Sequence, residues 1–149
     1  MNIAPLGLDE LPVAAALLEA NGLPTGDLSP AVRLLGVRDA RGLEGVVGLE
    51  ARGEAGLLRS LAVRSDRRES GLGSALVLEV ERMAAAAGIA ELYLLTTTAE
   101  RFFSHRGYHR AEREDAPAPI RTTSEFASVC PSSAVFMRKV LSRPVGAPR

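Results

Sequence analysis

The sequence lacks an excess of charge of either sign, and it has a single cysteine and no tryptophan. Its 149 residues include 18 lysine plus arginine and 18 aspartate plus glutamate residues, so the formal net charge is zero. Such a chain has no overall field that would gather nucleic acid or an anionic membrane, and we expect neither as a partner. One cysteine, Cys130, excludes an internal disulfide and a zinc site built on paired cysteines, and we expect no bound metal.

Long hydrophobic runs are also missing. No apolar stretch approaches the roughly 18 residues that a membrane span requires. The first residues, Met1 to Pro5, lack the charged region and apolar stretch of a signal peptide, so we expect a cytoplasmic location. The length predicts one domain over residues 1–141. We expect the segment 142–149 to be a frayed tail, because its two prolines and its glycine resist both helix and sheet.

The first half of the chain shows one helical pattern followed by strands. Asp9 is expected to cap a helix that runs through Leu18 and ends at Asn21-Gly22. Three short apolar segments joined by turns then predict an antiparallel meander, with strands over 32–38, 43–50 and 57–63.

The second half changes to a helical period and back. A helical stripe over 71–87 leads to a nearly continuous apolar strand over 91–96, which predicts a parallel pair of strands. Thr97 and Glu100 have the spacing of a capping box for a helix that stops at Gly107. Extended segments are expected over 108–113 and 134–141. The connection between them has about twenty residues, a length that often carries function. Together these patterns predict an α+β fold with a mixed sheet.

The most informative segment joins the third strand to the helix after it. It contains Arg68-Glu69-Ser70-Gly71-Leu72-Gly73, in which the glycines allow a tight turn and a close approach to a ligand. The first amides of a helix have no partner within the helix and lie at the positive end of its dipole, so this junction suits an anion such as a pyrophosphate. Arg64, Arg67 and Arg68 add local positive charge. The glycine order differs from the dinucleotide-binding fingerprint Gly-x-Gly-x-x-Gly, because position 76 is leucine.

These motifs resemble those of the GNAT superfamily of acetyl-CoA-dependent N-acetyltransferases. The family's pyrophosphate loop, Arg/Gln-x-x-Gly-x-Gly/Ala after a strand ending in Leu-Ala-Val, is similar to Leu61-Ala62-Val63 followed by Arg68 to Gly73. The segment from Ala99 to Tyr108 resembles the family's Ala-x-x-Phe-Tyr-x-x-x-Gly-Phe helix. The resemblance covers roughly residues 1–141. It implies a mostly antiparallel mixed sheet of about six to seven strands with a central, splayed parallel pair, flanked by about four helices.

A narrower resemblance is to arsenic-resistance N-acetyltransferases, and it is carried by the segments 56–63, 92–100 and 123–134. Close relatives of that branch are amino-acid acetyltransferases of the N-acetylglutamate-synthase type. The resemblance implies a role in arsenic resistance and a small-molecule acceptor with an α-amino group. That acceptor would be similar to glutamate, and the arsenic-containing glutamate analogue arsinothricin is one candidate.

The resemblance also implies how acetyl-CoA would be held. The backbone of the strand end would pair with the pantetheine arm, and the loop amides would cradle the pyrophosphate. The residues implied are Leu61, Ala62, Val63, Arg68, Glu69, Ser70, Gly71, Leu72, Gly73 and Ser74.

The implied reaction is direct attack of the amine on the thioester, without an enzyme nucleophile. A backbone N–H near Leu61 would stabilise the negative charge on the acetyl oxygen, and a general base must take a proton from the ammonium. Glu125 is a candidate base, acting through water, although a solvated surface position is the alternative. The family often has a tyrosine as general acid where this chain has Phe103. Ser104 or a water is left as its substitute.

The candidate acceptor-binding residues are Arg59, Ser60, Thr96, Thr97 and Arg121. Arg59 interrupts an apolar strand, and a guanidinium matches a substrate carboxylate with two parallel hydrogen bonds. The alternative is that Arg59 faces outward or pairs with Glu50. The threonines are alternatively caps and strand formers, and Arg121 is alternatively a solvated surface residue.

Two other functions stay open. The missing tyrosine and the lack of an unambiguous base allow a non-catalytic acyl-CoA sensor on the same fold. A protein N-acetyltransferase would need an open acceptor groove, against which the long connection over 114–133 argues. A homodimer formed through edge strands is also left open.

Overall fold

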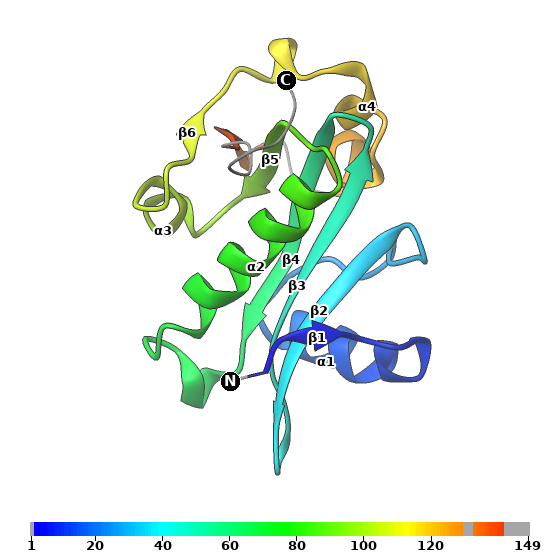
Figure 1. The fold of residues 1–149 in the computed structure, drawn as a ribbon, viewed down its shortest axis with the longest axis vertical. Helices are drawn as coiled ribbons and strands as arrows, with labels where there is room; N and C mark the ends of the chain where they lie inside the picture. The colour runs from blue at the N-terminus through cyan, green and yellow to red at the C-terminus, as the bar shows by residue number, and fades with distance from the viewer. Residues whose placement is uncertain (1, 130–132, 142–149) are drawn as a thin grey trace. The chain divides into compact units, whose positions relative to one another are not determined.

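The computed structural model describes residues 2–129 and 133–141 (Figure 1). Its strands form one seven-stranded mixed sheet in the order β1-β2-β3-β4-β5-β7-β6. The strands are β1 (Ala4–Pro5), β2 (Val32–Asp39), β3 (Gly42–Arg52), β4 (Ala55–Val63), β5 (Glu91–Thr96), β6 (His109–Arg110) and β7 (Val135–Val140). The α-helices are α1 (Leu11–Ala20), α2 (Leu72–Ala86), α3 (Glu100–Ser104) and α4 (Ala118–Arg121). The sequence therefore predicted the fold class and the main elements correctly.

The chain forms two compact units, each built from two separate stretches of sequence. The first comprises 1–50 and 58–82, and the second comprises 51–57 and 83–149. Three elements pass from one unit into the other. β3 and α2 begin in the first unit and end in the second, whereas β4 begins in the second and ends in the first.

In the first unit, β1, β2 and β3 pair antiparallel and bury apolar side chains on both faces. Ala14 and Leu18 of α1 pack in a cluster with Leu34 of β2 and Val46 of β3, and all four are buried. On the opposite face, the position of Gly45 leaves room for Leu72 and Leu76 of α2, whose side chains would lie only 3.0–3.1 Å from an added Cβ. Gly45 thus lets α2 pack closely on the sheet.

The start of α1 differs from the prediction. Asp9 does not cap the helix, because it lies inside a 3₁₀ turn, Leu8–Glu10, that precedes α1. Glu10 is the N-cap residue, and its Oε1 accepts a hydrogen bond of 3.1 Å from the Gly7 N–H. The predicted end is confirmed, since Gly22 has φ +72 and the Leu23 N–H donates to the Leu18 carbonyl over 3.0 Å.

In the second unit, β5 pairs in parallel with β4 over Ala55–Leu57 and antiparallel with β7 along its whole length. The predicted parallel pair is confirmed. The core joins Leu57, Tyr93 and Phe136 to Ala116 and Ile120, which come from the stretch between β6 and β7.

The sequence predicted this stretch as a long connection without helices, but the structure differs. It contains a 3₁₀ turn (Arg113–Asp115), α4 and a π-helix (Glu125–Val129). The expected strand over 108–113 is reduced to His109–Arg110, because the chain turns at Arg113 and buries Ala116. Thr97 is not a helix cap either. Ala99 is the N-cap residue of α3, and its N–H donates to Oγ1 of Thr96 over 2.9 Å.

Candidate functional site

The segment between β4 and α2 makes two backbone reversals within three residues. A 3₁₀ turn, Ser65–Arg67, follows β4, and Arg68 is extended. Glu69 then has φ +64 and Gly71 has φ +86, both in the left-handed region. For glutamate this conformation costs roughly 1–2 kcal/mol, which the surrounding structure must offset. The segment is therefore a shaped loop that delivers the chain directly into the 15-residue helix α2.

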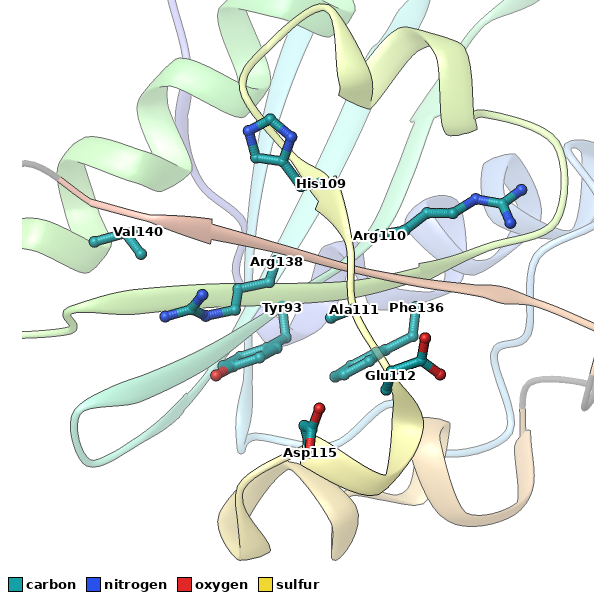
Figure 2. Close-up of a pocket in the computed structure, with 9 residues that line it drawn as sticks. All are labelled: Tyr93, His109, Arg110, Ala111, Glu112, Asp115, Phe136, Arg138 and Val140. Carbon is teal, nitrogen blue, oxygen red and sulfur yellow. The ribbon is translucent and has the colours of Figure 1, made fainter.

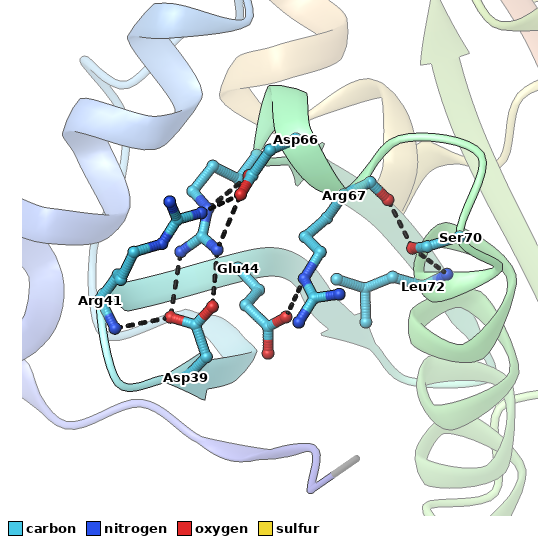
Figure 3. A network of polar contacts seen from close by, with 8 residues as sticks. Asp39, Arg41, Glu44, Asp66, Arg67, Ser70 and Leu72 are labelled. Atoms are coloured by element: carbon cyan, nitrogen blue, oxygen red, sulfur yellow. Dashed lines mark hydrogen bonds and ion pairs between the residues drawn. The ribbon is translucent and has the colours of Figure 1, made fainter.

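Ion pairs hold this loop against the turn between β2 and β3 (Figure 3). Arg64 binds Asp39 and Asp66, each over 2.6 Å, and Arg67 binds Glu44 over 2.6 Å. The hydrogen bonds that Arg64 donates hold the pKa of Asp39 well below its usual range, and the acceptance of these bonds by Asp39 and Asp66 raises the pKa of Arg64. These contacts fix the loop before any ligand is bound.

The same contacts change the predicted charge of the loop. The sequence placed three cations there, but carboxylates compensate Arg64 and Arg67. Arg68 instead donates to the amide oxygen of Asn21 over 2.8 Å, a neutral partner. Of the three arginines, Arg68 is thus the one with a neutral described partner, and its chain neighbour Glu69 is an exposed carboxylate.

The start of α2 provides amide donors beside Arg68. Oγ of Ser70 accepts from the Leu72 N–H over 3.4 Å and donates to the Arg67 carbonyl over 2.5 Å. The first four N–H groups of an α-helix have no partner within the helix, and they lie at the positive end of its dipole. This combination of a shaped loop, a helix start and an exposed arginine can bind an anion.

A hollow of about 390 Å³ lies beside the loop in the first unit. It is lined by Asn2, Val37, Arg38, Glu44, Arg67, Ser70 and Leu72. Sequence reasoning missed Asp39 and Glu44 as partners of this loop, because these two residues are typical parts of a turn and a strand.

Arg59 and Ser60 lie in β4, before the loop. The side chain of Arg59 is fully buried and binds Asp27 through two hydrogen bonds of 2.5 and 2.6 Å and Glu50 through one of 2.9 Å. The alternative in which Arg59 pairs with Glu50 therefore matches the structure, and a substrate carboxylate would have to compete with two protein carboxylates. The hydrogen bond from Arg59 lowers the pKa of Asp27. Ser60 is buried and has φ +59.

The remaining predicted residues lie in the second unit. Thr97 and Ser104 are exposed, whereas Thr96 is half-buried and binds the Ala99 amide. Phe103 is 4% exposed and packs edge-on against Tyr108, with ring centroids 5.5 Å apart, so it belongs to the core. No hydroxyl occupies that position.

Arg121 and Glu125 follow in the stretch before β7. Arg121 donates to the carbonyls of Ala116 and Glu114 over 2.8 and 2.9 Å. Glu125 is 5% exposed, so its carboxylate lies in the interior of the second unit.

A second hollow, of about 490 Å³, lies in the second unit beside β6 and β7 (Figure 2). Its floor includes the stacked rings of Tyr93 and Phe136, whose centroids are 5.4 Å apart. None of the predicted site residues lines it.

Two further expectations concern absences. Within residues 2–129 and 133–141, no group of three histidine, cysteine, aspartate or glutamate side chains is placed to hold a metal ion. Cys130 lies outside the described residues. No helix in the described part of the chain is long and apolar enough to cross a membrane.

Comparison with known proteins identifies the family. The model of the acetyltransferase (GNAT) domain matches residues 31–110, more than half of the chain and the whole of the β4–α2 segment. The chain belongs to the GNAT acetyltransferase family. The seven-stranded fold with its parallel pair is accordingly the GNAT fold.

Curated relatives of this GNAT chain include amino-acid acetyltransferases from pseudomonads and Azotobacter. It is 37% identical to that of Ectopseudomonas mendocina over 65 residues, 44% of this chain and 15% of the relative. It is 37% identical to that of Pseudomonas aeruginosa over 73 residues, 49% of this chain and 17% of the relative. The chain thus spans less than one fifth of the length of these relatives.

Solved structures show the same fold. N-acetylglutamate synthase from Neisseria gonorrhoeae, complexed with coenzyme A and L-arginine, has a TM-score of 0.76 at 21% identity over 95% of this chain and 33% of that chain. The ribosomal-protein-S18-alanine N-acetyltransferase from Escherichia coli has a TM-score of 0.72 at 16% identity, covering 99% of this GNAT chain and 98% of that chain. At these identities the likeness concerns the fold.

Proposed function

We propose that this GNAT chain transfers the acetyl group of acetyl-CoA to the amine of a small amino acid or an amino-acid analogue. The observation that carries the proposal is the loop from Arg68 to Gly73, which reverses the backbone at Glu69 and Gly71 and opens directly into α2. The curated relatives, which are amino-acid acetyltransferases, support the class of acceptor.

The residues present fit acetyl-CoA, which supplies the activated acetyl group. The amides from Arg68 to Ser74 cradle the pyrophosphate, and the guanidinium of Arg68 exchanges its neutral partner, Asn21, for a phosphate oxygen. Leu61, Ala62 and Val63 at the end of β4 offer the backbone groups for the pantetheine arm. Because ion pairs already fix the loop, little ordering entropy is lost on binding.

The transfer forms a bond between the amine nitrogen and the acetyl carbon and breaks the bond from that carbon to sulfur. The N–H of Leu61 stabilises the negative charge on the acetyl oxygen. Glu125 accepts the ammonium proton through water. The core position of Phe103 leaves Ser104 or water to protonate the departing thiolate.

The acceptor binds through its amine and its carboxylate. Arg121 supports this role, because its guanidinium donates to neutral backbone carbonyls and its charge stays available to an anion. Ser60, Thr96 and Thr97 supply hydroxyls for the polar end of the acceptor. Glutamate and arsinothricin are the first acceptors to test, and acetylation of the latter would give the chain a role in arsenic resistance.

A thiol-release assay tests the proposal. The protein is mixed with acetyl-CoA and a panel of amino acids, including glutamate and its phosphinic and arsinic analogues, and free thiol is followed over time. We expect turnover with at least one amino acid and much less with the matching amine that lacks the carboxylate. Absence of thiol release with every amine, together with absence of CoA binding by calorimetry, would refute the proposal.

The same pair of measurements identifies the alternative sensor. Phe103, buried where the family often has a tyrosine, is the observation that favours a non-catalytic acyl-CoA-binding protein. That protein would bind CoA and release no thiol with any acceptor. Turnover on a peptide N-terminus but not on free amino acids would instead indicate a protein N-acetyltransferase.

A further inference from the structure

Glu44 is an acidic residue in a buried strand. It lies in β3 between Leu43 and Gly45, which are buried, and only 8% of its own surface is exposed. A carboxylate in such a place is costly unless it is paired. Its partner is Arg67 of the loop after β4, whose Nε lies 2.6 Å from Oε1 of Glu44. An apolar side chain would fill this position of the strand without that cost, so the contact with the loop accounts for the carboxylate.

Glu44 holds both ends of the 3₁₀ turn Ser65–Arg67. Its backbone carbonyl accepts a hydrogen bond of 2.7 Å from the N–H of Arg64, the N-cap residue of the turn. Its carboxylate pairs with Arg67, the last residue of the turn, whose N–H donates to the Arg64 carbonyl over 2.8 Å. The first contact needs no particular side chain, whereas the second needs a carboxylate. The side chain of Glu44 therefore fixes the direction in which the chain leaves the turn.

Ser70 connects this turn to the start of α2 (Figure 3). Its Oγ donates to the Arg67 carbonyl over 2.5 Å and accepts from the Leu72 N–H over 3.4 Å. Glu44, Arg67, Ser70 and Leu72 also line the same hollow, so their contacts form a continuous series in space. A shift of Arg67 would thus be transmitted to the first amides of α2.

We propose that Glu44 is a positioning residue for acetyl-CoA, which sets the placement of the first amides of α2 through Arg67 and Ser70. The inference rests on the proposed function for the identity of the ligand, but the series of contacts does not. Glu44 itself does not touch the ligand. Its negative charge disfavours an anion nearby, so its benefit is one of geometry: amides that are already in place bind the pyrophosphate with little loss of ordering entropy.

The sign of the change in CoA affinity separates positioning from charge. Glu44→Gln removes a negative charge beside an anion, so Coulomb's law alone predicts tighter binding. Positioning predicts weaker binding, and we expect calorimetry to show a CoA Kd about tenfold higher than that of the parent. Glu50→Gln is the matched control, because Glu50 is a glutamate of the same strand, 4% exposed, that pairs over 2.9 Å with an arginine outside the loop, Arg59. Its CoA Kd should equal that of the parent.

Glu44→Met keeps the test valid if the glutamine variant does not fold. An apolar side chain of similar length suits the buried strand, and Arg67, with 46% of its side chain exposed, can be solvated instead. The unfolding midpoint should therefore stay near that of the parent, while the CoA Kd rises as in Glu44→Gln. A merely structural role would not weaken binding in a variant of unchanged stability. An unchanged or lower Kd in the Glu44 variants, or an equal rise in Glu50→Gln, would overturn the inference.

A double variant tests the route through Ser70. Arg67 and Ser70 are both exposed, so Arg67→Gln and Ser70→Ala should fold. If Arg67 acts through Ser70, Arg67→Gln adds little to the Kd change of Ser70→Ala, because residues that act as a unit are not additive. Additive changes would mean that the charge of Arg67 and the hydroxyl of Ser70 each act on CoA directly, and they would overturn the route.

Hydrogen exchange of the protein without CoA tests the series of contacts separately from binding. Amides in 70–74 should exchange about tenfold faster in Glu44→Gln than in the parent, and at the parental rate in Glu50→Gln. Unchanged exchange in Glu44→Gln refutes the inference even if the parent binds CoA and releases thiol. Faster exchange in a protein that neither binds CoA nor releases thiol supports the series of contacts and refutes the proposed function instead.

Discussion

Single residues with left-handed backbone decide the shape of the loop from Arg68 to Gly73. Gly71 has φ +86, and an added Cβ would meet no atom within 4 Å, so the cost of a side chain there comes from the backbone alone. The same is true of Gly53, φ +69, in the turn between β3 and β4. The two positions therefore form a matched pair, one inside the loop and one outside it.

We expect Gly71→Ala and Gly53→Ala each to lower the unfolding free energy by about 1 kcal/mol, because alanine disfavours positive φ. Only Gly71→Ala should weaken CoA binding, by about tenfold or more, since relief of the strain moves the amides that cradle the pyrophosphate. Urea denaturation and calorimetry with CoA give the two quantities. Equal CoA affinity in both variants would show that the loop is not the CoA site.

For single residues, the sequence predicted which ones are unusual better than it predicted the residues that they contact. It singled out Gly71 and Arg59, because a glycine at a strand–helix junction and a charge in an apolar strand are patterns that can be recognised from neighbouring residues in the sequence. It missed Asp27, which lies 32 positions before Arg59. Nothing local to Leu23-Pro24-Thr25-Gly26-Asp27 distinguishes a buried ion-pair partner from an ordinary loop aspartate.

Among the elements, the turn between β2 and β3 and the 3₁₀ turn after β4 are joined by charge. Arg64 bridges Asp39, the last residue of β2 before that turn, to Asp66 of the 3₁₀ turn, and its hydrogen bonds lower the pKa of both carboxyls. A carboxyl whose pKa is lower in the folded state stabilises the fold above its ordinary range, about pH 4, and this contribution is lost as the pH falls through the lowered value.

Asp39→Asn should consequently destabilise the protein most near neutral pH. We expect the difference in unfolding free energy between parent and variant to stay constant from about pH 8 to 5 and to shrink below about pH 4. Urea titrations across that range measure it. Arg64→Met removes the donor from the same bond and should give the same convergence. A difference that is independent of pH would mean that packing, and not the ion pair, holds the turn.

Element boundaries were predicted well where periodicity is strong and poorly where tertiary contacts decide. β5 was predicted over 91–96 and is observed there, and α2 differs by one residue at each end from 71–87. The stretch after β6 was predicted as a connection, yet Ala116 and Ile120 anchor short helical turns in the core. Elements of three to five residues have no period long enough to detect, so only their packing reveals them.

For the whole molecule, the interleaving of the two units has a consequence for unfolding. Each unit depends on two stretches of sequence, and β3, β4 and α2 are shared between them. A unit therefore cannot lose its structure without disrupting an element of the other. We expect a single cooperative transition, as the prediction of one domain over residues 1–141 requires.

The aromatic content allows a direct test. The chain has two tyrosines and no tryptophan, and Tyr93 and Tyr108 both lie buried in the second unit. Tyrosine fluorescence thus reports on the second unit, whereas far-ultraviolet circular dichroism reports on the helices and strands of both. The two signals should give coincident urea transitions, and saturating CoA, bound at the loop in the first unit, should shift both midpoints upward together. If CoA moved the dichroism transition and left the tyrosine transition in place, the units would unfold independently and the single-domain prediction would be wrong.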